Sequence, residues 1–159
     1  MLAALALTGA AVTGCSTTGT GGDSGTGGDT GTDGLLKGAE LDAWADGAIP
    51  ENELGGASYL VREVGSLTPG SEIGVDLADL SGAATLSISC LMSEGGTISV
   101  TVQAPGDSGT DTVACSPLDS PAAEVAGLVP VSDAATVSIS ADTPAVFVYA
   151  VTPATEGTR

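Results

Sequence analysis

The chain contains no histidine among its 159 residues. That absence excludes catalysis by Ser-His-Asp or Cys-His groups, and it excludes histidine ligation of a metal. Basic residues are scarce as well: 3 Lys and Arg stand against 20 Asp and Glu, for a formal net charge of -17 at pH 7. This charge argues against nucleic acid and against electrostatic attachment to anionic lipid. We therefore predict no nucleic-acid partner, no metal site and no cofactor.

The N-terminal residues are apolar but too few to cross a membrane. Residues 2–12 contain only Leu, Ala, Thr, Gly and Val, whereas a transmembrane helix needs about 20 apolar residues. Their length is typical of the apolar region of a secretory signal, although no Lys or Arg precedes them. We predict a signal peptide over residues 1–14.

The end of this segment carries a short motif. Val12-Thr13-Gly14-Cys15 places an aliphatic residue and two small residues directly before a cysteine. The motif resembles the lipobox of bacterial lipoproteins, which implies cleavage before Cys15, a diacylglycerol on its thiol and an acyl group such as palmitate on the new amino terminus. Two or more acyl chains anchor a protein stably where one does not. The alternatives are a buried cysteine in an apolar helix and a soluble secreted protein cut nearby.

The segment after the motif contains only four kinds of residue. Residues 16–34 are all Gly, Ser, Thr or Asp, none of which can bury much apolar area. A Gly-rich coil of this length has a root-mean-square reach of roughly 25 Å. We predict that residues 15–34 are a lipidated cysteine and a disordered tether that holds the folded part away from a membrane.

Apolar residues return after the tether. Within residues 39–47, Leu41, Trp44 and Ala45 fall on one helical face, which predicts a short helix in an otherwise irregular region over residues 35–56. We interpret Trp44 as a cover for the core, with a ligand contact as the alternative.

The rest of the chain alternates aliphatic and polar residues with period two, which is typical of half-buried strands. Three near copies of one hydroxyl-aliphatic pattern occupy residues 85–89, 97–101 and 136–140. Further strands are expected over residues 59–64, 73–77 and 145–151 and near Thr112. Gly- and Pro-containing turns separate them. We predict an antiparallel β-sandwich of about seven or eight short strands over residues 57–159.

The last predicted strand differs from the others because both of its faces are apolar. Val146, Val148 and Ala150 alternate with Phe147 and Tyr149. Either a second layer covers the outer face, or that face is an exposed contact surface. We favour coverage by the segment that carries Trp44.

Two cysteines continue the inward phase of predicted strands. Cys90 follows the 86–88 aliphatics and Cys115 follows Val113, and a secreted context is oxidising, so we predict a Cys90–Cys115 disulfide. In a simple meander these strands would lie about 10 Å apart on either side of a third strand. A disulfide needs Cα atoms within about 7 Å. Residues 112–115 must therefore cross to the facing sheet or add outside the 86–90 strand.

Motifs that suggest catalysis have simpler interpretations. Gly106-Asp107-Ser108-Gly109 matches the core of the trypsin-like serine protease motif, but without a histidine base we interpret it as a polar turn. Asp107 and Asp111 could bind calcium loosely, although loop carboxylates in an acidic protein are more often simply solvated. We predict no catalytic residues, with a hydrolase as a remote alternative.

The whole chain resembles small envelope lipoproteins of high-GC Gram-positive bacteria in composition and in its arrangement of a tethered β domain. The resemblance implies an extracytoplasmic protein, lipid-anchored to the cell membrane through Cys15. We expect a non-enzymatic domain with a structural or protein-binding role and an envelope protein or glycan as partner. The alternative is a ligand-binding module for glycans or a small solute, with a concave site lined by Trp44, Phe147 or Tyr149.

Overall fold

The computed structural model describes residues 34–54, 56–77, 81–122, 124–132 and 135–154. The predicted signal peptide, the lipobox with Cys15 and the tether up to residue 33 lie outside the described residues. The described elements, in chain order, are α1 (Ala39–Ala48), β1 (Glu53–Leu54), β2 (Ala57–Ser58), β3 (Val61–Leu67), β4 (Glu72–Asp76), β5 (Ala84–Met92), β6 (Gly96–Ala104), β7 (Asp107–Pro117), β8 (Gly127–Val131), β9 (Thr136–Ser140) and β10 (Ala145–Pro153).

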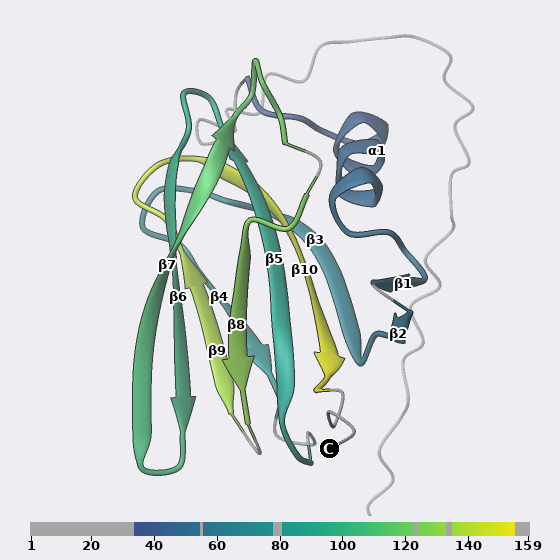
Figure 1. Ribbon diagram of the computed structural model, residues 1–159. Coiled ribbons are helices and arrows are strands. Elements are labelled where there is room, and N and C mark those ends of the chain that lie inside the picture. The colour runs from purple at the N-terminus through teal and green to yellow at the C-terminus, as the bar shows by residue number, and fades with distance from the viewer. Residues whose placement is uncertain (1–33, 55, 78–80, 123, 133–134, 155–159) are drawn as a thin grey trace, which may run out of the picture.

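Eight of the strands form one nearly closed, barrel-like sheet (Figure 1). Its order is β3-β10-β5-β7-β6-β9-β4, and β8 pairs with β5. The short strands β1 and β2 form a separate pair, and β1 lies inside the 35–56 region predicted to be irregular or helical. This arrangement confirms a mostly β domain with the expected number of strands.

The sheet is mixed, so the prediction of a purely antiparallel sandwich is wrong. β5 and β7 run parallel where Leu91 pairs with Ser116 and Met92 pairs with Pro117, whereas the other pairings of the described strands are antiparallel. The parallel contact arises because β7 continues past its last partner on β6, Gly96, and so reaches β5. This contact joins the β7-β6-β9-β4 half to the β8-β5-β10-β3 half, and one continuous sheet results.

The main core lies between these two halves and follows the predicted alternation. On β6, Ile98 and Val100 are fully buried, whereas Thr97, which points to the other face of the strand, is exposed. Hydroxyl side chains occupy the outer face, and Thr101 Oγ1 lies 2.9 Å from Thr110 Oγ1 on the neighbouring strand β7. Water covers this face of the sheet, so its polar residues keep their hydration.

β10 is buried on both faces, as the sequence predicted. Phe147 and Tyr149 point into the main core, and Val146, Val148 and Ala150 pack in a second apolar cluster under α1. Figure 1 shows α1 lying beside β10 and β3, outside the sheet. The covering layer is the segment that carries the tryptophan, which was the expected one.

The predicted helix over residues 39–47 is confirmed by α1. Trp44, Ala45 and Ala48 are buried against the sheet, and the indole Nε1 of Trp44 donates a hydrogen bond to Ala122 O at 3.4 Å. Arg62 of β3 fastens the end of the helix: its Nη2 donates to Asp46 Oδ1 at 2.7 Å and its Nε to a backbone carbonyl at 2.9 Å. Apolar contacts and the two hydrogen bonds of Arg62 thus hold α1 on the sheet. The Trp44 hydrogen bond joins the helix to the segment between β7 and β8.

Two strand assignments needed the structure. The 106–109 segment predicted as a polar turn mostly belongs to β7, because the turn is Pro105-Gly106, where Gly106 has a φ of 87°. β8 was not expected, since its sequence contains Gly127 and Pro130. A proline is tolerated there because β8 has a strand partner, β5, on one side only.

Candidate functional site

The sheet does not close between β3 and β4, and this gap is the first candidate site. The two strands are joined by the tight turn at residues 68–71, where Ser71 N donates to Thr68 O at 2.9 Å. Beyond the turn they separate, because β3 pairs with β10 and β4 pairs with β9. Among the described strands neither has a partner on the side that faces the other. We call this gap the seam.

Aromatic side chains from β10 pack against the inner side of β3, the strand that borders the seam. The ring of Phe147 lies over Gly65 of β3, where a Cβ atom would stand 2.8 Å from Phe147 Cζ. The ring of Tyr149 follows it, with centroids 6.1 Å apart and planes inclined by 12°. Glycine at position 65 therefore leaves the space that the Phe147 ring needs.

The hydroxyl of Tyr149 donates a hydrogen bond to Glu63 Oε2 at 2.8 Å, across paired positions of β10 and β3. Burial of the ring raises the pKa of Tyr149 far above its usual value of about 10, and the hydrogen bond and charge of Glu63 raise it further. The phenol consequently stays protonated at any physiological pH. It serves as a donor that holds Glu63 at the seam, and it cannot act as a base.

The seam opens into a pocket at the end far from the turn. The cavity holds about 370 Å³ and lies between the start of β3, the end of β4 and the end of β10. The residues that line it are Leu60, Val61, Asp76, Leu77, Ser81, Ala83 and Pro153. Leu77 is buried, whereas Leu60 is 54% exposed and stands at the rim. We call this cavity the seam pocket.

A second opening separates β7 from β8. The two strands meet where Gly127 approaches Val113: a Cβ at Gly127 would stand 2.7 Å from Val113 Cγ2. They then diverge toward the 105–106 turn and leave a cavity of about 210 Å³, lined by Val102, Ala104, Asp107, Gly109, Asp111, Pro130 and Ser132.

This smaller cavity brings Asp107 and Asp111 to one face of β7. Residues four apart on a strand are separated by about 13 Å, too far for both carboxylates to hold one calcium ion. Within the described ranges no group of three or more His, Cys, Asp and Glu side chains could hold a metal ion. Asp107 and Asp111 are therefore two separate, exposed carboxylates.

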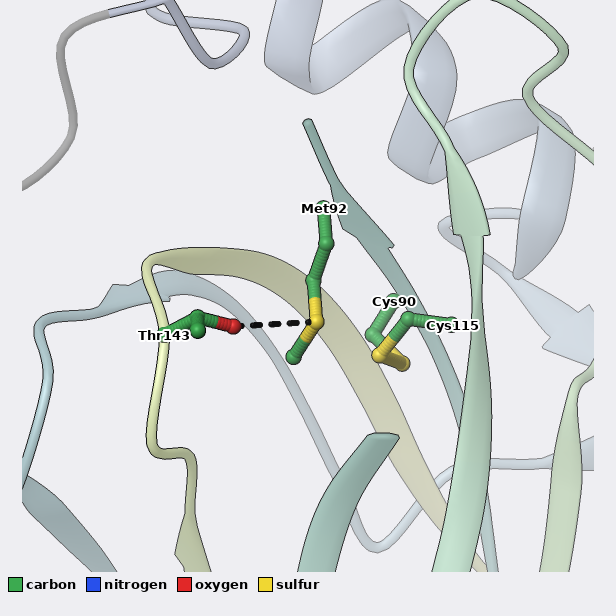
Figure 2. The surroundings of a disulfide bond; sticks show 4 residues. All are labelled: Cys90, Met92, Cys115 and Thr143. Carbon is green, nitrogen blue, oxygen red and sulfur yellow. Dashed lines mark hydrogen bonds between the residues drawn. A yellow bond between two sulfur atoms is a disulfide. The ribbon is translucent and has the colours of Figure 1, made fainter. Parts of the chain in front are cut away.

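The predicted disulfide is confirmed. Cys90 and Cys115 are joined with their Cα atoms 4.8 Å apart, at the place where β7 comes alongside β5. Figure 2 shows the bridge beside Met92, whose Sδ accepts a hydrogen bond from Thr143 Oγ1 at 3.4 Å. Of the two placements expected for residues 112–115, the structure shows the crossing to the facing side: these residues pair with β6 in the opposite half of the sheet, and only Ser116 and Pro117 lie alongside β5. Both cysteines are buried, so the bridge links the two halves of the sheet from within.

Of the other predicted site residues, Phe147 and Tyr149 stack on each other, but Trp44 lies on the opposite side of β10. Phe147 and Tyr149 are 2% and 1% exposed on the inner face of β10, and Trp44 is buried against the outer face of the same strand. None of the three lines either cavity described above. Sequence reasoning also missed the seam pocket, whose only signal was Leu60, an aliphatic residue out of phase with the inward face of the predicted 59–64 strand.

No protein-family model matches this chain, and no curated protein matches its sequence. Within the described part of the chain, α1 is far too short to span a bilayer, and no other helix there could do so.

Proposed function

We propose that the chain is an extracytoplasmic lipoprotein, anchored to the cell membrane through Cys15, whose β domain supports or binds other proteins and catalyses no reaction. The observation that carries the proposal is the buried Cys90–Cys115 disulfide. Such bridges form and persist outside the reducing cytosol. The bridge uses two of the chain's 3 cysteines, and the third stands in the lipobox motif.

The start of the folded body supports the tether. Leu35, the second described residue, is already 7% exposed and packs in the cluster under α1. Packing therefore begins directly after the Gly, Ser, Thr and Asp segment of the sequence. A lipid on Cys15 would place this domain at a distance set by the tether alone.

A non-catalytic role is supported by the chemistry of the described side chains. The chain has no histidine, and the one clearly displaced pKa belongs to Tyr149, a core residue held protonated by burial. The alternative function, a module for glycans or a small solute, has less support. Glycan sites commonly rest on exposed aromatic rings, and Trp44 and Phe147 are buried.

Membrane fractionation tests the proposal. The full chain and its Cys15→Ala variant are expressed in a bacterium that processes lipoproteins, with Ser16→Ala as the matched control. We expect wild type and Ser16→Ala in the membrane fraction and Cys15→Ala in the soluble fraction. Retention of Cys15→Ala in the membrane would contradict the anchor. Mass spectrometry without reduction should show the peptides of Cys90 and Cys115 joined; free thiols there would contradict an oxidising location.

A further inference from the structure

We propose that the seam pocket binds an extended peptide segment of a partner protein, in which an apolar side chain is flanked by Lys or Arg. The segment would lie along the seam as an added strand and place its apolar side chain between Leu60 and Leu77. The inference deepens the protein-binding role proposed above and rests on it. Four features of the described residues support it.

The shape of the pocket suits an apolar side chain. Val61, Leu77 and Ala83 provide apolar lining, and its volume of about 370 Å³ is near the lower end of the range found for ligand sites. Leu60 is one of two large aliphatic side chains that the described residues leave mostly exposed. An occupant that covered Leu60 would remove this apolar surface from water, which is favourable.

The seam also offers strand edges. Among the strands that the structure describes, β3 and β4 are the two ends of the order, and neither pairs with a strand on the side that faces the seam. A Cβ atom built on Gly74 of β4 would meet no atom within 4 Å, so the outer face of that strand is open. Peptides recognised by strand addition gain main-chain hydrogen bonds from such edges and specificity from pockets that take alternate side chains.

The charges along the seam are negative. Glu63 of β3 and Glu72 and Asp76 of β4 carry carboxylates. Of the chain's 3 basic residues the structure describes two, and Arg62 on the outer face of β3 is paired with Asp46. A basic segment thus complements the seam, whereas an acidic one would be repelled.

The spacing of the carboxylates favours a peptide over a small cation. Glu72 and Asp76 are four residues apart on one strand, or about 13 Å, so a small amine would reach one of them only. In an extended peptide, Lys side chains recur on one face every second residue and can approach both. An apolar residue in the next position would then point to the opposite face, toward the pocket.

The binding test uses the full chain with Cys15→Ser, which cannot be acylated, so its result is independent of membrane attachment. The probe is a short synthetic peptide in which Lys alternates with Val and Leu. The readout is the shift of the backbone amide signals of Val61, Leu77 and Ala83 on titration. Two further probes are used. The same peptide with Glu in place of Lys tests the contribution of charge, and isopentylammonium, a small amine with an apolar tail, tests whether a peptide backbone is needed.

Two pocket variants and one control locate the site. Ala83→Leu fills the pocket from an exposed position and should weaken binding about tenfold, as loss of a well-packed anchor does. Asp76→Asn should weaken it about threefold, the size of one exposed charge pair, and the effect should shrink in high salt. Asp107→Asn makes the same charge change at the other opening and should leave binding unchanged. Thermal unfolding of each variant checks that it is folded.

The proposal is supported if the Lys peptide shifts these amides, the Glu peptide does not, and Ala83→Leu weakens the effect. It is overturned if the Lys peptide leaves the three amides unshifted, or if both variants bind it as wild type does. Equal binding of the Glu peptide would refute the electrostatic part, and equally tight binding of isopentylammonium would replace the peptide with a small amine. Failure here with Cys15-dependent membrane attachment intact leaves the anchor standing and removes only this partner.

Discussion

β10 and β6 are strands of equal length in the same sheet, yet they meet different surroundings. Both contain nine residues, but eight of the nine in β10 are buried, whereas β6 buries only Ile98 and Val100. The inner faces of the two strands share one core. The outer face of β10 is aliphatic and lies under α1, and the outer face of β6 carries hydroxyls and meets water.

The difference between the two outer faces explains why α1 packs on β10 and not on β6. An aliphatic outer face on β10 leaves apolar area in water unless another layer covers it, and α1 supplies that layer. On β6, Ser99 and Thr101 make the outer face compatible with solvent, and no described element covers it. The character of the outer residues thus decides which half of the sheet is covered by a further layer.

The largest effect is expected from the inner face of β10. Phe147→Ala should lower the free energy of unfolding by about 4 kcal/mol, because it leaves a cavity in the main core over Gly65 of β3, the strand that borders the seam. Urea unfolding followed by circular dichroism measures the change. Leu128→Ala on β8 is the control, since that side chain is 67% exposed and its loss should cost less than about 0.5 kcal/mol. Similar losses in the two variants would mean that the main core is not packed as described.

The disulfide connects the half of the sheet that contains β10 to the half that contains β6. Replacing Cys90 and Cys115 by Ala should cost about 3.5 kcal/mol, the chain-entropy value for residues 25 apart in sequence. Denaturant midpoints of the double variant and of wild type, with and without reductant, measure it. Reduced wild type should match the double variant. A midpoint unaffected by reduction would show that the strands hold together without the bridge.

The outer faces of β10 and β6 can be compared directly by one truncation in each. Val148→Ala, under α1, should cost about 2 kcal/mol from lost methyl burial and the cavity left behind. Thr101→Ala, on the exposed face, should cost about 0.5 kcal/mol, the value of a cross-strand pair with Thr110. Equal costs for the two truncations would show that the helix adds nothing to the stability of β10.

A smaller change than that of Val148→Ala is expected at the Tyr149 hydroxyl. Tyr149→Phe removes the hydrogen bond to Glu63 and should cost about 1 kcal/mol. Because burial raises the pKa of Tyr149 in the folded state, its contribution is fully present below pH about 10 and is lost as the pH rises above that value. The free energy of unfolding measured between pH 8 and 11 should fall more steeply for wild type than for Tyr149→Phe. Parallel curves would place the loss on other groups.

Local features of the fold could be predicted from the sequence where one residue pattern allowed a single outcome. The alternation over residues 85–89, 97–101 and 136–140 identified β5, β6 and β9. The two apolar faces of residues 145–151 predicted a covered strand, and Cys90 and Cys115 were correctly paired from their strand phases and the distance a disulfide allows.

The rest could not be predicted because it depends on where segments meet. The parallel contact of Leu91 with Ser116 forms because β7 is long. The Gly and Asp residues in its first half are uncommon in strands, so the sequence did not predict this length. The seam pocket arises because β3 and β4 pair with different partners, and no residue near Leu60 or Asp76 signals that divergence. The sequence also left open which face of β10 meets α1, and so on which side of the strand Tyr149 lies.

The position of β10 has a consequence for how the chain folds. It is the last of the described strands in chain order, yet it lies between β3 and β5 and pairs with both. Of the pairings in the main sheet, only β6 with β7 joins strands adjacent along the chain. Contacts so distant in sequence make folding slow, typically milliseconds to seconds. A nascent chain therefore holds the β10-facing edges of β3 and β5 open until residues 145–153 have been synthesised.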